Sequence, residues 1–336
     1  MHVRLSRRRT LGLGATSTVA LLAAPRIGRA QGADKVALQT SWRAQAEQGG
    51  YYQAMATGLY KQAGLEVEIK PGGPQLDANA LLLANRVDFI ESNMLGTLNF
   101  ARENLPGVAV ASFFQKDPRV LLSHPGVGND TLPALKGKPI LVATAGRQGY
   151  WLWLKAKYGY SDDQVKPYTF NMAPFLADKS ISMQGLLTSE PYAVRQAGVE
   201  PVIHLLADHG FANYQATVMT SPRMIADKPD VVQRFVDATI KGWVSYLAAD
   251  PAPGNALIKK DNPDMTDDKI AFAIESLKKN GVVGGGDAPR LGYGAMTAER
   301  WHSFYKDMAV AGALPQGLSI DKVFTTQFVN KKVGMT

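Results

Sequence analysis

Short runs of β-branched and apolar residues alternate with helix-forming segments along this chain, and that order limits its fold more than any other feature. In the first third, strands are predicted over residues 35–39, 65–69, 87–90 and 108–113, and helices over residues 52–57 and 76–85. Two strands joined through a helix usually lie parallel in one sheet, with the helix on a face of that sheet. The pattern therefore predicts an α/β protein whose sheets are mainly parallel and carry helices on both faces.

The same order begins again after the His124-Pro125-Gly126 segment. Strands are predicted over residues 140–143, 165–170, 185–188 and 202–206, and helices over residues 149–158 and 174–179. Two such sets in one chain predict two lobes, and a chain of 336 residues is long enough to build both of them.

The last third is mostly helical. Apolar residues from Val232 to Leu247 repeat at helical spacing, and Pro229 suits the first turn of that helix. Thr266 is placed to cap a second helix that Gly281 ends. We expect these helices to pack back on the first lobe. The predicted limits are residues 31–118 and 216–330 for lobe 1, residues 119–215 for lobe 2, and residues 119–124 and 212–218 for a hinge of two crossovers.

Residues 1–30 have the parts of an export signal. A charged start with arginines at 7–9 precedes an apolar stretch over residues 11–24, and the small residues Gly28 and Ala30 suit signal peptidase. Cleavage after Ala30 and a periplasmic location are predicted. The serine and twin arginines resemble a twin-arginine signal. An ordinary secretory signal and an uncleaved anchor are the alternatives, although the apolar stretch is short for a membrane span.

The charge and the absence of cysteine exclude several classes of protein. The formal net charge is +8, but six arginines and no acidic residue stand in residues 1–30, and the rest carries 31 basic and 29 acidic residues. The basic character therefore belongs to the leader and does not indicate nucleic acid as a partner. A chain without cysteine has no disulfide, no thiolate metal site and no lipoprotein anchor.

No pattern of residues points to catalysis. The five histidines lack the spacing of metal ligands, and the chain contains neither a nucleophile elbow nor a phosphate-binding P-loop nor a complete dinucleotide fingerprint. We therefore predict no catalytic residue, no metal and no cofactor.

Aromatic and amide side chains stand instead at the ends of predicted strands. The candidate ligand-binding residues are Trp42, Gln48, Asn93, Tyr150, Glu190 and Tyr192. Ligands of open α/β sheets bind outside the carboxyl ends of the strands, so groups from both lobes can face one cleft. An indole offers a flat apolar platform for a planar ligand, and amides and a carboxylate can bind its edge. Taken singly, each residue could instead serve core packing or a helix cap.

Several segments resemble a known family. They are residues 41–54, 58–60, 63–67, 86–89, 135–138 and 188–192. Together they resemble the solute-binding proteins of nitrate, sulfonate and taurine importers, and in particular the branch that binds thiamine pyrimidine precursors. The resemblance implies a two-lobed periplasmic binding protein, type II-like, that delivers a ligand to an inner-membrane ABC permease with a cytoplasmic ATPase. It also implies that Trp42 stacks on the ligand ring and Glu190 accepts a hydrogen bond from its amino group.

Two departures leave the ligand open. Glu47 and Gln48 stand where pyrimidine-binding members usually have Asn-His, and Ser182 stands where an acidic residue usually precedes the Glu-Pro segment. A thiamine pyrimidine precursor is the first expectation. Another aromatic or heterocyclic compound, including a flavin, comes next, and sulfonate, taurine or nitrate follow because no arginine pair stands among the candidate residues.

Two other classes of protein compete with an importer component. The pyrimidine synthase has the same fold, but it needs a lysine and a histidine where this chain has Ser92 and Gly96, and its iron motif needs cysteine. An enzyme is therefore disfavoured. A ligand sensor would need the same lobes and the same ligand, and the sequence does not separate it from an importer protein. A monomer is expected in either case.

Overall fold

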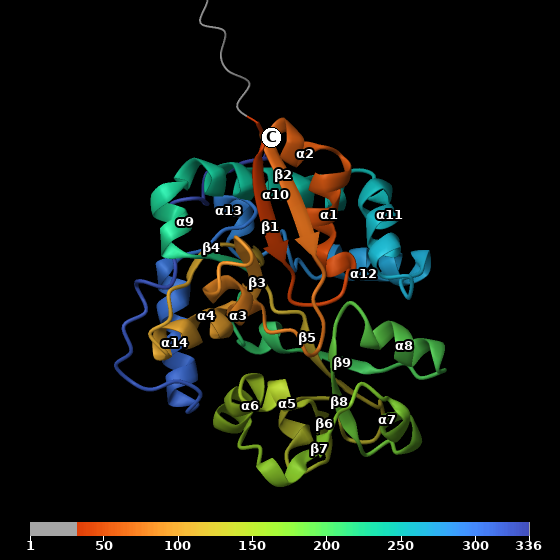
Figure 1. Ribbon diagram of the computed structural model, residues 1–336. Coiled ribbons are helices and arrows are strands. Elements are labelled where there is room, and N and C mark those ends of the chain that lie inside the picture. Colours follow the sequence, from red (N-terminus) through yellow and green to blue (C-terminus); the bar gives the residue numbers. More distant parts are fainter. Residues whose placement is uncertain (1–31, 336) are drawn as a thin grey trace, which may run out of the picture. The chain divides into compact units, whose positions relative to one another are not determined.

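The computed structural model describes residues 32–335, and the predicted export signal over residues 1–30 lies outside them. Ten strands in these residues form two five-stranded sheets, and Figure 1 shows the elements with their labels. Sheet A has the order β2 (Leu65–Lys70), β1 (Asp34–Gln39), β3 (Phe89–Asn93), β10 (Gln215–Thr220), β4 (Val108–Phe114). Sheet B has the order β7 (Val165–Pro167), β6 (Ile140–Val142), β8 (Ser182–Leu186), β5 (Arg119–Ser123), β9 (Val202–Leu205).

Each sheet is mainly parallel with one reversed strand. In sheet A, β1 pairs in parallel with β2 and β3, whereas β10 runs antiparallel to both β3 and β4. Sheet B repeats this arrangement, because β6 pairs in parallel with β7 and β8, and β5 runs antiparallel to β8 and β9. The predicted two-lobed α/β fold is confirmed, and the reversed strands make the sheets mixed.

Neither reversed strand was predicted. Both coincide with the predicted hinge segments, residues 119–124 and 212–218, where β5 and β10 begin. The strands of sheet A come from residues 34–114 and 215–220, and those of sheet B come from residues 119–205. This division supports the predicted lobe limits, which stay a proposal, as does the hinge.

Helices alternate with these strands and fill the last third. Around sheet A and in the last third they are α1 (Gly49–Ala56), α2 (Leu59–Gln62), α3 (Ala78–Leu83), α4 (Met94–Arg102), α9 (Pro222–Asp227), α10 (Pro229–Ala248), α11 (Ala252–Asp261), α12 (Asp267–Lys279), α13 (Ala288–Leu291) and α14 (Ala298–Val310). Between the strands of sheet B they are α5 (Thr144–Arg147), α6 (Tyr150–Tyr158), α7 (Ala173–Ala177) and α8 (Glu190–Gln196). Short 3-10 turns are η1 (Ala46–Gln48), η2 (Pro133–Leu135), η3 (Asp162–Gln164) and η4 (Leu206–His209).

The helices of the last third begin and end where the sequence predicts. Pro229 opens α10, where its missing N–H costs no hydrogen bond. Thr266 caps α12 by accepting a hydrogen bond from the backbone N–H of Lys269 at 3.3 Å, and α12 ends at Lys279, before Gly281 with φ +60°.

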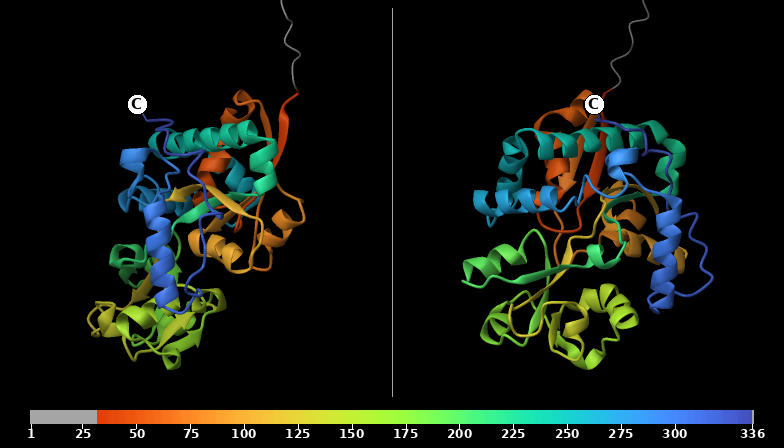
Figure 2. Two further views of the ribbon diagram at one scale, coloured as in Figure 1. Left: turned by 90° about the vertical axis from the view of Figure 1, so that its left-hand side faces the viewer. Right: turned by 180° about the vertical axis from the view of Figure 1, so that it is seen from behind.

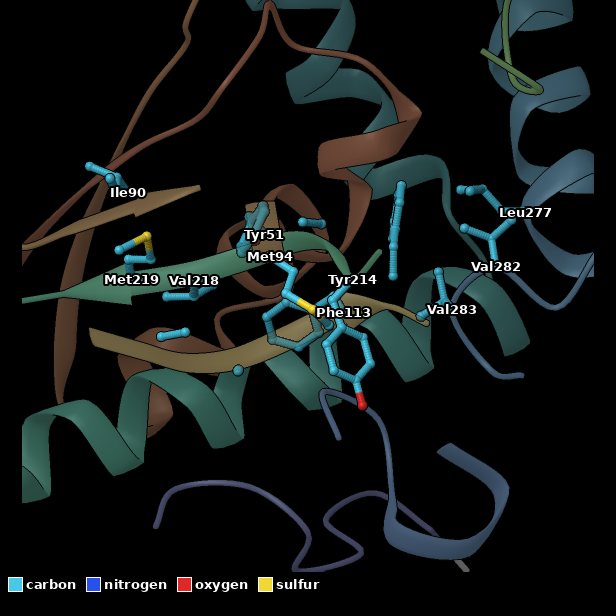
Figure 3. Close-up of a cluster of buried hydrophobic side chains, with 14 of the residues drawn as sticks. Tyr51, Ile90, Met94, Phe113, Tyr214, Val218, Met219, Leu277, Val282 and Val283 are labelled. Carbon is cyan, nitrogen blue, oxygen red and sulfur yellow. The ribbon is translucent and has the colours of Figure 1, made fainter. Parts of the chain in front are cut away.

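The core of the first lobe joins sheet A to helices from distant parts of the chain. Figure 3 shows Phe113 of β4 and Met219 of β10 in one cluster with Tyr51 of α1, Met94 of α4 and Leu277 of α12. All five side chains are 0 % exposed. Their burial fixes the first turn of α1, and with it the segment between β1 and α1 that carries Trp42.

Candidate functional site

A cavity of about 350 Å³ is lined by residues from four segments of the chain. They are Trp42, Arg43, Gln45 and Glu47 after β1; Tyr168, Phe170 and Met172 after β7; Thr188, Ser189, Glu190, Tyr192 and Ala193 after β8; and Asn262, Asp264, Met265 and Lys269 around the α11–α12 connection. The first and last groups accompany sheet A, and the other two follow strands of sheet B. A volume of this size lies within the range of small-molecule sites, roughly 300–1,000 Å³.

Trp42 is held by its backbone. Its carbonyl oxygen accepts hydrogen bonds from the N–H of Gly72 and from the hydroxyl of Thr40, both at 2.8 Å. A side chain at position 72 could not fit, because its Cβ would lie 2.4 Å from the carbonyl oxygen of Thr40. The indole is half-buried, and its ring centroid lies 5.9 Å from that of Phe170 with the planes tilted by 39°.

Glu190 is a half-buried carboxylate at the start of α8. Its Oε2 accepts hydrogen bonds from the backbone N–H of Leu186 at 2.8 Å and from the hydroxyl of Ser189 at 2.5 Å. Its Oε1 accepts only a long hydrogen bond, 3.4 Å, from the hydroxyl of Tyr168. One carboxylate oxygen is therefore fixed by the protein, and the other has capacity for a ligand donor.

Glu47 brings a second carboxylate to the cavity. It lies on η1 with 8 % of its surface exposed, and it accepts a hydrogen bond from the hydroxyl of Thr188 at 2.5 Å. This contact joins the segment after β1 to the segment after β8. Burial raises the pKa of Glu47, the Thr188 hydrogen bond opposes that rise, and repulsion from Glu190 adds to it.

A third carboxylate lies behind the cavity. Glu91 on β3 is 5 % exposed and accepts hydrogen bonds from Ser41 Oγ at 2.5 Å and from Gln48 Nε2 at 3.3 Å. Burial raises the pKa of Glu91 to about 7, although both hydrogen bonds lower it, and the charge of Glu47 raises it further. Glu91 Oε2 and Gln48 Oε1 are buried and have no hydrogen-bond partner within the described residues.

Three of the six predicted ligand-binding residues line the cavity: Trp42, Glu190 and Tyr192. The other three have structural partners. Gln48 donates to Glu91, Asn93 caps α4 by accepting from the N–H of Gly96 at 2.9 Å, and the hydroxyl of Tyr150 donates to Gln184 Oε1 at 2.7 Å. These three residues do not line the cavity, and their role as ligand contacts stays a prediction.

Several lining residues were not predicted. Tyr168 and Phe170 fall inside the strand predicted over residues 165–170, but β7 ends at Pro167 and the chain turns there. Asn262 and Lys269 carry no local signal, because they reach the cavity only through the packing of α11 and α12. Glu47 was not among the six candidate residues. It follows Trp42 by five positions, and its carboxylate, where pyrimidine-binding members usually have asparagine, was the signal that could have identified it.

The described residues, 32–335, contain no group of three or more histidine, aspartate or glutamate side chains placed to hold a metal ion. In the same residues, no helix has both the length and the apolar character needed to cross a membrane.

The two sheets and the cavity lined from both of them define a two-lobed periplasmic binding-protein fold. Solved structures of this fold include the aliphatic sulphonate binding protein SsuA of Escherichia coli, with 11 % identity over 86 % of this chain and 91 % of that one and a TM-score of 0.66. They also include the alkanesulfonate-binding protein SsuA of Xanthomonas axonopodis pv. citri bound to MOPS, with 12 % identity, 87 % and 98 % coverage and a TM-score of 0.61.

The chain belongs to the NMT1/THI5-like family, which residues 45–253 match. This match confirms the family resemblance of the sequence motifs. A curated relative, the riboflavin-binding protein RibY of Chloroflexus aurantiacus, is 24 % identical over 94 % of this chain and 91 % of its own. The desulfurization enzyme DSZB also has a similar structure, with 12 % identity, 88 % and 97 % coverage and a TM-score of 0.55, so the fold alone does not separate binding proteins from enzymes.

Proposed function

We propose that this protein is an exported solute-binding protein of an ABC importer and that it captures one planar nitrogen heterocycle in the cavity beside Trp42. The observation that carries the proposal is the chemistry of the cavity lining. Aromatic side chains from both sheets stand beside the carboxylates of Glu47 and Glu190, in a cavity of about 350 Å³. Aromatic faces bind flat rings, and carboxylate oxygens accept hydrogen bonds from ring N–H or amino groups.

The charges of the lining disfavour an anionic ligand. Arg43 lies 3.8 Å from Asp264, and Lys269 donates to the carbonyl oxygen of Asp264 at 2.9 Å, so both cations already have oxygen partners. Glu47 and Glu190 would repel a sulfonate or nitrate group. This lining therefore favours a neutral or cationic ligand, although the chain shares the fold of the sulfonate-binding proteins.

Riboflavin is the first ligand we propose within this class. The relative named as a riboflavin-binding protein matches the chain over nearly its whole length, and the aromatic lining suits an extended conjugated ring. A thiamine pyrimidine precursor is the second candidate. Its specific support is Glu190, which precedes Pro191 and lines the same cavity as Trp42, the pair that the family resemblance implies for a pyrimidine.

The same lining gives little support to an enzyme. Both carboxylates of the cavity accept hydrogen bonds from neighbouring protein groups, and a chain without cysteine has no thiol nucleophile. We propose a periplasmic protein cleaved after Ala30 that acts as a monomer and delivers its ligand to an inner-membrane permease coupled to an ATPase.

A thermal-shift comparison tests the proposed function. The purified protein is melted with riboflavin, thiamine, its hydroxymethyl- and formylamino-pyrimidine precursors, taurine, an alkanesulfonate or nitrate. A ligand that binds only the folded state raises the melting temperature. We expect riboflavin to give the largest shift and the anions none. A shift with sulfonates alone would overturn the proposed ligand class.

A further inference from the structure

We propose that Phe170 is the second wall of an aromatic clamp whose first wall is Trp42, and that the ligand ring binds between the two side chains. The inference rests on the proposed function and deepens it. It assigns a ligand contact to the segment between β7 and α7, and it restricts the ligand to flat, fully conjugated ring systems.

Phe170 is the most exposed aromatic side chain of the cavity lining. Its side chain is 60 % exposed, although it borders the cavity. A phenyl ring normally lies in the core, and each exposed ring leaves apolar surface in water. Phe170 takes no part in the buried core, so folding alone gives no reason for a large aromatic residue here.

The backbone of Phe170 adds a second observation. Its φ is +63°, in the left-handed region that bulky side chains rarely adopt. Glycine or asparagine would fit this turn with less strain. Strained backbone of this kind is concentrated at binding and catalytic sites, where the surrounding structure holds a side chain in a required place. Here the strained residue aims an exposed ring toward Trp42.

The geometry of the aromatic group fits a clamp that opens for its ligand. Trp42 and Phe170 are 5.9 Å apart between ring centroids, and Tyr168 lies 5.4 Å from Phe170 on the sheet B side. A ring held between two aromatic walls needs roughly 3.5 Å on each face, or about 7 Å between the walls. Movement of roughly 1 Å by the exposed Phe170, with a rotation that removes the 39° tilt between the two planes, would therefore admit a ring.

This arrangement defines what the ligand must look like. Both faces of the ring meet aromatic walls, so neither face can carry a substituent or a saturated carbon. One edge then meets the carboxylates of Glu47 and Glu190, and that edge must carry N–H or amino groups. A fused conjugated heterocycle satisfies both demands, whereas an alkanesulfonate satisfies neither.

Riboflavin fluorescence provides the test, because stacking on aromatic side chains quenches flavin emission. The titration compares the wild-type protein with Phe170→Ala, Phe170→Leu and Phe170→Tyr. Val310→Ala is the control, since Val310 is 72 % exposed and does not line the cavity. We expect the Ala and Leu variants to raise the Kd about tenfold and to quench less, whereas the Tyr variant and the control keep both values.

If Phe170→Ala and Phe170→Leu bind riboflavin with the same Kd and the same quenching as the wild-type protein, the clamp is overturned and the proposed function stays intact. A wild-type protein that binds neither riboflavin nor the hydroxymethylpyrimidine would overturn both proposals.

A second variant separates a ligand contact from a structural residue. Phe170→Gly relieves the left-handed backbone and removes an exposed ring, so the melting temperature without ligand should stay equal or rise. Phe175→Ala is the matched comparison. Phe175 is 0 % exposed, so its replacement should clearly lower the melting temperature. A large loss of stability in Phe170→Gly would contradict the clamp, since Phe170 would then serve the fold.

Discussion

Single residues at the cavity divide into those that the fold holds and those that are left for a ligand. Backbone hydrogen bonds fix Trp42 and leave its indole face to the cavity. Glu190 binds the protein through Oε2 and has capacity at Oε1. Glu47 already accepts a hydrogen bond from Thr188. That bond is made at Oε1, so both carboxylates have an oxygen with capacity for a ligand donor.

Removing the indole tests its role directly. Trp42→Ala deletes an aromatic platform without touching the backbone hydrogen bonds that hold its loop. We expect riboflavin affinity to fall by about 1–3 kcal/mol, the usual effect of losing one stacked contact. Titration calorimetry measures the change, and Trp42→Phe should lose less. An unchanged affinity in Trp42→Ala would remove the stacking role.

The buried acid Glu91 gives a prediction for pH. Its pKa lies at about 7 in the folded protein against 4.5 when unperturbed, so the folded state binds an extra proton between these two values. Stability should therefore fall as pH rises from about 4.5 to about 7 and level off above that. Glu91→Gln removes this dependence and should be more stable than wild type above pH 7, by an amount on the order of 3 kcal/mol.

Urea unfolding at pH 5 and pH 8 measures the difference between the two proteins. In Glu91→Gln, the amide oxygen can still accept the hydrogen bond from Ser41. The new amide N–H can donate to Gln48 Oε1, which is buried and has no donor within the described residues. An equal stability difference at both pH values would show that Glu91 is not the titrating group. Glu47→Gln is the matched comparison. Burial also raises the pKa of Glu47, so we expect this variant to weaken the pH dependence of stability in the same direction.

Part of the site could be predicted from sequence because it depends on local position. Trp42 and Glu190 follow strands directly, and the carboxyl ends of strands in such sheets face the ligand. The same argument brought in Asn93 and Tyr150, which the structure gives to a helix cap and to Gln184. Strand ends also supply caps and core contacts, and sequence does not distinguish these uses.

At the scale of elements, the reversed strands β5 and β10 were the part of the fold that sequence did not predict. β5 is an apolar run without alternation, and β10 pairs with β3 and β4, which lie about a hundred residues earlier in the chain. Local periodicity identifies strands that alternate or follow helices, but it carries no information about such distant pairing. The helices α10 and α12 were predictable because their caps and apolar spacing are local.

The packing of α1 against α10 gives a prediction about helix contact. A Cβ at Gly242 would lie 2.2 Å from the carbonyl oxygen of Gly50, so the two backbones approach each other more closely than an alanine allows. Gly242→Ala should destabilise the protein by about 1–3 kcal/mol, although alanine favours a helix. Urea unfolding measures the loss. Gly73→Ala is the control, because nothing lies within 4 Å of its added Cβ, and equal effects would contradict close packing.

At the scale of the whole molecule, two connections join the sheets. Residues 115–118 link β4 to β5, and residues 206–214 link β9 to β10. A hydrogen bond of 2.7 Å from Asn213 Nδ2 to Asp117 Oδ2 ties the two connections together. Figure 2 shows α14 reaching toward the helices of sheet B, and Phe304 of α14 packs on Phe211 of the 206–214 connection with 5.5 Å between the ring centroids. The two connections therefore lie side by side, as the proposed hinge of two crossovers requires.

The hydrogen bond from Thr188 to Glu47 joins the segment after β8 to the segment after β1 at the cavity, so we expect it to help hold the two lobes around a ligand. Thr188→Val keeps the shape but removes the donor, leaving a buried carboxylate with one partner fewer. We expect riboflavin affinity to fall by about 1.5–3 kcal/mol, since hydrogen bonds to charged groups contribute about that much. Thr188→Ser keeps the hydroxyl and should bind as wild type does. Equal affinity in all three proteins would exclude a closing role.

Titration calorimetry of riboflavin into the purified protein tests the central claim most directly, with taurine as the comparison ligand. The account predicts one riboflavin per chain with a dissociation constant in the micromolar range or tighter, and no heat from taurine. Heat from taurine and none from riboflavin or the hydroxymethylpyrimidine would contradict it.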